Sequence, residues 1–110
     1  MKQAPDIRFI GMEPSDALEA AALEKASKLD QLCPQLMACH VVIELPHRHR
    51  SQGRQFAVRV DATVPGRTLT VSRIEHEDVY VALRDAFDGM RRQLEDAMGR
   101  QQEMVRQPPP

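Results

Sequence analysis

The segment HEDVYVALRDAFDGMRRQLEDAMGRQQ, which runs from His76 to Gln102, has the periodicity of one long amphipathic helix. Its apolar residues recur three or four positions apart, which aligns them in one stripe. Asp78 stands before the first of them, where a carboxylate accepts the unpaired backbone N–H groups of a helix start. We expect the helix to fray at Gly99. The apolar stripe must pack against another part of the protein. The residues of the stripe are Val79, Leu83, Ala86, Phe87, Met90, Leu94, Ala97 and Met98.

The chain before this helix begins with a short strand and a second helix. Residues 7–10 alternate, with Ile7 and Phe9 on one face. Ser15 is a plausible N-cap for a helix that Pro34 ends, because proline cannot donate the next backbone hydrogen bond. The thin apolar stripe of this helix consists of Leu18, Ala22, Leu29 and Leu32.

Three further strands are predicted over residues 37–45, 55–64 and 67–74, because apolar and polar residues alternate in each. Pro65-Gly66 suits the centre of a type II turn between the last two strands. The polar segment that follows Pro46 is expected to be a hairpin loop. The residues assigned to the core face are Cys39, Val41, Ile43, Leu45, Phe56, Val58, Val60, Ala62, Val64, Leu69 and Val71.

The resulting order is β-α-β-β-β-α, which predicts an α+β fold. A strand, a helix and a strand favour a right-handed parallel crossover, and short loops then give an antiparallel meander. We therefore expect a four-stranded mixed sheet with both helices packed on one face. The other face, with Thr63, Thr68, Thr70 and Ser72, is left to solvent or a partner.

The 110 residues and 42% hydrophobic content suit one domain, predicted over residues 1–104, with a disordered Pro-rich tail at 105–110. No apolar run has the length of a membrane span or signal peptide, so a cytoplasmic location is expected. Cys33 and Cys39 lack the close spacing of a zinc site, and we interpret both as free, mostly buried thiols.

The net charge of −1 hides a segregation along the chain. Residues 47–74 carry six basic residues against one acidic residue, whereas the segments on either side are acidic. His47 and His49 add to this positive field as the pH falls. The pattern indicates either a local site for an anionic partner or simply a solvated loop.

Catalytic chemistry has no specific signal in this sequence. There is no glycine-rich phosphate loop, nucleophile elbow or HExxH pattern, so we predict neither an enzyme nor a cofactor. His47 and His49 could meet a metal ion together with His40 or His76, but solvated histidines are the simpler interpretation, and no metal site is predicted.

Basic residues in three places make RNA binding the better hypothesis, because arginine and lysine neutralise phosphate. Tyr80 is the single tyrosine and tryptophan is absent, so no platform for stacking bases is expected and recognition of folded RNA through its backbone is favoured. We expect Tyr80 to pack where the helix meets the sheet. The candidate nucleic-acid-binding residues are Lys25, Lys28, Arg48, Arg50, Arg54, Arg91 and Arg92.

Several stretches together resemble the ribosome hibernation promoting factors, also called Y-type ribosome-associated translation inhibitors or sigma-54 modulation protein-like proteins. Ser15-Asp16-Ala17-Leu18, followed by Lys25-x-x-Lys28-Leu29, resembles the first helix of this family. Asp78-x-Tyr80-x-Ala82-Leu83, followed by Asp88 and Arg92-Gln93-Leu94, is similar to its last helix.

The resemblance implies a fold similar to a double-stranded-RNA-binding domain. It also implies binding to the small ribosomal subunit, through ribosomal RNA in the channel for messenger and transfer RNA. Lys25, Lys28 and Arg92 are the matched basic positions. The expected function is inhibition of translation under stress. The alternative is a protein-interaction or homodimerisation module that uses the uncovered sheet face or an outer strand.

Overall fold

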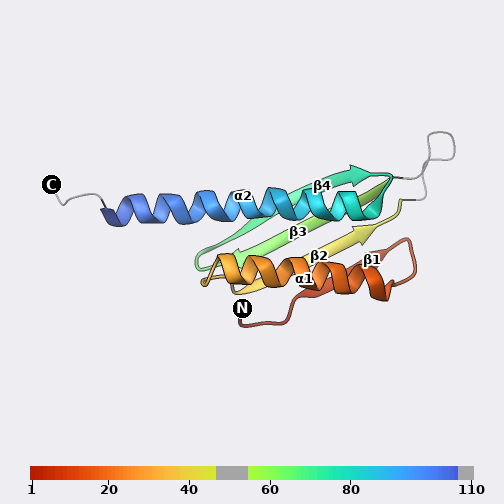
Figure 1. Cartoon of the computed structure of the whole chain (residues 1–110), viewed down its shortest axis with the longest axis horizontal. Coiled ribbons are helices and arrows are strands. Elements are labelled where there is room, and N and C mark those ends of the chain that lie inside the picture. The colour runs from red at the N-terminus through yellow and green to blue at the C-terminus, as the bar shows by residue number, and fades with distance from the viewer. Residues whose placement is uncertain (47–54, 107–110) are drawn as a thin grey trace.

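The computed structural model describes residues 1–46 and 55–106, and it describes side chains as far as Gly99. The elements follow the predicted order (Figure 1). They are β1 (Asp6–Ile10), α1 (Asp16–Leu32), β2 (Ala38–Glu44), β3 (Phe56–Val64), β4 (Arg67–His76) and α2 (Val79–Arg106).

The four strands form one sheet in the order β1-β2-β3-β4. β1 pairs with β2 in parallel, and the two remaining pairings are antiparallel. Figure 1 shows both helices on the same side of the sheet, with α1 near β1 and α2 along β3 and β4. The predicted α+β fold and its mixed sheet are therefore confirmed.

Local signals set the ends of these elements. The Leu18 N–H donates to Ser15 Oγ at 3.2 Å, so Ser15 is the N-cap of α1 as predicted. At the start of α2, the Tyr80 N–H donates to Asp78 Oδ1 at 2.9 Å. Gly66 has a φ of 86°, which the turn between β3 and β4 requires and which glycine accepts without strain.

The core lies between the sheet and the two helices. The stripe of α2 is buried at its centre, and Leu83, Met90 and Leu94 are fully inaccessible to solvent. Ala26 of α1 and Ala82 of α2 are also buried, although neither was assigned to a stripe. Small side chains at these positions let the helices approach the sheet closely. The core can therefore be densely packed although the chain has few aromatic residues.

α2 continues through Gly99, so the expectation of fraying there was wrong. Its 28 residues make it about 42 Å long at roughly 1.5 Å per residue, and in Figure 1 it extends beyond the sheet. The helix includes residues 105 and 106, whereas 107–110 of the predicted tail lie outside the described residues.

Candidate nucleic-acid interface

Three of the predicted RNA-binding residues, Arg48, Arg50 and Arg54, lie outside the described residues, as do His47 and His49. The segment that carries them joins the end of β2 to the start of β3. Their role in binding RNA therefore stays a prediction from the sequence.

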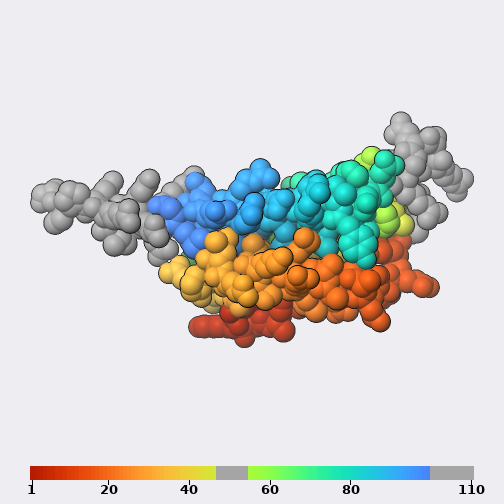
Figure 2. Space-filling model, viewed as in Figure 1, coloured from red at the N-terminus to blue at the C-terminus, as the bar shows by residue number. Residues whose placement is uncertain are grey.

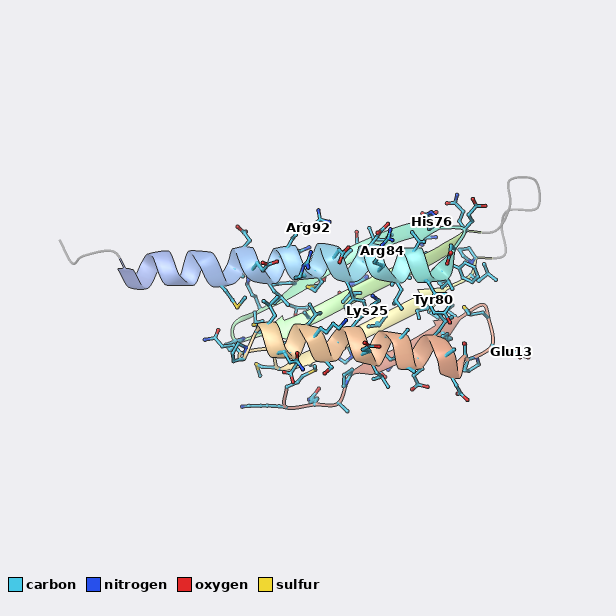
Figure 3. The ribbon with its side chains drawn as sticks, viewed as in Figure 1. Glu13, Lys25, His76, Tyr80, Arg84 and Arg92 are labelled. Carbon is cyan, nitrogen blue, oxygen red and sulfur yellow. The ribbon has the colours of Figure 1, made fainter. Side chains whose placement is uncertain are left out.

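The other four candidate residues lie on α1 and α2, which contact each other and form one face of the molecule (Figure 2). We call the exposed surface of these two helices the two-helix face. Figure 3 shows Lys25 on the side of α1 that faces α2, and Lys28 follows it three positions later, about one turn along the same helix. Arg91 follows Arg84 by seven positions, so helical spacing places the two within about 20° of each other around α2. Arg92 is on the other side of α2, away from Lys25 (Figure 3). The structure therefore places Lys25 toward the neighbouring helix and Arg92 away from it.

Acidic neighbours partly neutralise these cations. Lys28 Nζ lies 3.8 Å from Glu24 Oε1, and Arg91 Nε lies 3.6 Å from Glu95 Oε1. Both pairs are exposed, and exposed pairs contribute little to stability, so a phosphate can replace the carboxylate at small cost. Lys25 and Arg92 form no ion pair with another residue that the structure describes. They are the cations most readily available to an anionic ligand.

Two residues of this face were missing from the sequence-based site. Tyr80 is 49% exposed, so the expectation that it packs where the helix meets the sheet was wrong. It lies about 100° from Val79 around the helix but only about 20° from Phe87, seven positions further on, so helical spacing places it at the edge of the apolar stripe. Arg84 is one turn further along the same flank, and its Nη2 lies 3.2 Å from Asp85 Oδ1. The polar character of Arg84 was a signal for its exposure, whereas the spacing of Tyr80 gave no such signal.

The uncovered face of the sheet has a different electrostatic character. Its arginines each pair with a carboxylate: Arg8 with Asp6 at 3.0 Å, Arg59 with Asp61 at 3.1 Å, and Arg73 with Glu75 at 2.9 Å. The hydrogen bond from Arg8, helped by His40, holds the pKa of Asp6 below its usual value of 3.8. Arg73 also lies 3.6 Å from Glu44. These three arginines face four carboxylates, so this face offers phosphate no excess of positive charge.

The described part of the chain lacks some groups that catalytic or metal sites often use. It contains no buried charged side chain and no group of three histidine, cysteine or acidic residues placed to hold a metal ion. Cys33 and Cys39 are free and buried, as predicted. None of the described helices combines the length and the hydropathy needed to cross a membrane.

Comparison with known proteins identifies the family. The family model for sigma 54 modulation protein / S30EA ribosomal protein matches residues 6–102, which is nearly the whole chain. The chain belongs to this family. The resemblance found in the two helices is therefore confirmed, and the family is one of ribosome-associated factors rather than of enzymes.

Two solved structures share the fold of this chain. A ribosomal subunit interface protein from Coxiella burnetii is 16% identical, with a TM-score of 0.73, and the match covers 86% of this chain and 97% of that one. The N-terminal domain of Protein Y from Thermus thermophilus is 25% identical, with a TM-score of 0.61, and the match covers 83% of this chain and 97% of that one. The search of curated proteins gives no significant match.

Proposed function

We propose that this S30EA-family chain is a cytoplasmic, non-enzymatic factor that binds the small ribosomal subunit and inhibits translation under stress. The observation that carries the proposal is the family match over residues 6–102, together with the two solved relatives, whose names refer to the ribosomal subunit interface and to Protein Y. Binding would occlude the RNA channel in which decoding takes place, and no chemical step is needed.

The distribution of charge supports the two-helix face as the surface that contacts ribosomal RNA. Lys25 and Arg92 are available there, and the exposed pairs of Lys28 and Arg91 are easily exchanged for phosphate. The uncovered sheet face has its charges paired within itself. Arg48, Arg50 and Arg54, for which the sequence predicts a hairpin loop, would add a second contact with the same RNA.

The test is the affinity of the protein for purified small subunits, measured at several salt concentrations. A plot of log affinity against log salt concentration has a negative slope, and each phosphate contact that is lost makes this slope shallower by roughly 0.7–0.9. We therefore expect Lys25→Ala, Arg92→Ala and the triple variant Arg48→Ala, Arg50→Ala, Arg54→Ala to bind more weakly, with shallower salt dependence. Arg67→Ala, at the first residue of β4, is the matched control and should bind like the unchanged protein.

Unchanged binding of the helix variants would remove the two-helix face from the proposal, and unchanged binding of the triple variant would remove the loop. A chain that shows no affinity for subunits, but whose mass in solution rises with concentration, would instead be the homodimerisation module that the sequence left as an alternative.

A further inference from the structure

The single tyrosine of the chain is displayed rather than buried. Among the described residues, the large hydrophobic side chains with substantial exposure are Ile10, Leu23 and Tyr80, and Tyr80 is 49% exposed. Aromatic side chains usually contribute to the core, and this one is absent from it although tryptophan is lacking and phenylalanine occurs only three times. The ring is therefore available for contact with a partner.

The backbone that carries Tyr80 is fixed on both sides. Its N–H donates to Asp78 Oδ1 at 2.9 Å, and the N–H of Asp78 in turn donates to His76 Nδ1 at 2.9 Å. The next turn of α2 is anchored by Ala82 and Leu83, which are fully buried. The ring therefore projects from a rigid first turn of helix, so little backbone freedom is lost when a ligand packs against it.

Two cationic side chains lie on the same face as the ring, together with the carboxylates of Asp78 and Asp85. Figure 3 shows Lys25 of α1 and Tyr80 of α2 on the sides of their helices that face each other, with Arg84 one turn beyond Tyr80. Lys25 has no ion pair with another described residue, and the partner of Arg84 is the exposed Asp85. A flat apolar surface beside positive charges suits a ligand that combines a planar ring with phosphates, namely a nucleotide of an RNA strand.

We propose that Tyr80 stacks on an unpaired RNA base, while Lys25 and Arg84 contact the phosphates beside that base. This inference rests on the proposed function and deepens it, because it adds contact with one base to recognition of the RNA backbone. Stacking tolerates any base, since each has a π-face, so the contact selects unpaired RNA rather than a sequence.

Tyr80 can be observed in isolation because the chain has no other tyrosine. Protein labelled with 3-fluorotyrosine should give one ¹⁹F resonance, which we expect to move upfield when a short single-stranded oligoadenylate is added, because the ring current of a stacked base shields the fluorine. An abasic strand of equal length and charge should leave the resonance almost unmoved. Binding without an upfield shift would overturn the stacking contact.

Affinity of variants provides the second readout. Removing one base–aromatic stack costs roughly 1–3 kcal/mol, so Tyr80→Ala should weaken oligoadenylate binding by roughly 5- to 150-fold, whereas Tyr80→Phe should retain it. Binding of the abasic strand should be the same for Tyr80→Ala and the unchanged protein. Lys25→Ala should reduce the salt dependence on both strands. Equal losses for Tyr80→Ala on both strands, or no loss on either, would contradict the proposal.

The same variants on purified small subunits separate this inference from the proposed function. If the unchanged protein does not bind subunits but stacks on oligoadenylate, the ribosomal proposal fails and the stacking contact stands. If the unchanged protein and Tyr80→Ala bind subunits equally and no ¹⁹F shift occurs, only the stacking contact fails. A shift and a loss of affinity on both ligands would support the two together.

Discussion

Gln93 of α2 donates a hydrogen bond from its Nε2 to the backbone carbonyl oxygen of Thr70 in β4, at 2.9 Å. β4 is an edge strand, so one side of its backbone lacks a neighbouring strand. The long helix thus satisfies a carbonyl group at the edge of the sheet that it covers. An edge occupied in this way is also less open to pairing with another chain.

Replacing Gln93 with alanine should destabilise the fold by about 1 kcal/mol, because the partly buried carbonyl of Thr70 loses its partner. Urea unfolding measures this change. Gln31→Ala, an exposed change of the same kind in α1, is the control and should have a much smaller effect. Equal midpoints for the two variants would mean that the bond to Thr70 does not contribute to stability.

A close approach of α2 to β4 occurs at Gly89. A Cβ atom there would lie 3.3 Å from Cγ2 of Val71, which is tighter than ordinary van der Waals contact. Alanine gains about 1 kcal/mol over glycine in a helix, but overpacking costs about 1–3 kcal/mol, so we expect Gly89→Ala to be neutral or destabilising.

In a Val71→Ala background the crowding disappears, and Gly89→Ala should then stabilise the protein. Unfolding of the four proteins of this double-mutant cycle gives the coupling between the two positions. Identical effects of Gly89→Ala in both backgrounds would contradict the packing described here.

The central stripe of α2 should carry much of the stability. Leu83 is fully buried, so Leu83→Ala should cost about 2–5 kcal/mol through lost burial and the cavity it leaves. Leu23 of α1 is 38% exposed, and Leu23→Ala should cost clearly less. Chemical unfolding distinguishes them, and a similar loss for both leucines would place the core elsewhere.

Stability should fall in alkaline solution because of Cys39. Burial, with a smaller contribution from the charge of Asp61, raises the pKa of Cys39 from 9.0 to about 11. Between these pH values the unfolded chain has lost this proton and the folded chain keeps it, so stability falls as the pH rises through the window and levels off above it.

The Cys39→Ala variant lacks the thiol, so the stability of this variant should fall less over the same pH range than that of the unchanged protein. The measurement is the free energy of unfolding of both proteins from about pH 8 to about pH 11, a range that includes both pKa values of Cys39. The comparison uses the slopes, since the variant also loses packing. Parallel profiles would show that Cys39 does not titrate as its burial requires.

The fold was largely predictable because its sequence signals are local. Alternation in the strands and the stripe of α2 each follow from one period, and Ser15 and Asp78 mark helix starts by capping. Gly99 was misjudged since one glycine lowers helix stability by only about 1 kcal/mol, which an otherwise favourable helix tolerates.

The site was less predictable because it depends on how two distant helices meet. Lys25 and Tyr80 are far apart in the chain, and only the packing of α1 beside α2 places them on one face. The exposure of Tyr80 was missed because aromatic residues generally prefer the core, and because its spacing from Leu83 and Phe87 is also that of the apolar stripe. The pairing of charges across the sheet face also depends on strand register, as for His40 and Asp6 in neighbouring strands.

Sedimentation of the purified protein with separated ribosomal subunits through a sucrose gradient, at low and at physiological salt, tests the central claim most directly. We predict that the protein migrates with the small subunit and remains with it at physiological salt. Protein that stays at the top of the gradient at both salt concentrations, or that follows the large subunit instead, would contradict the proposed function.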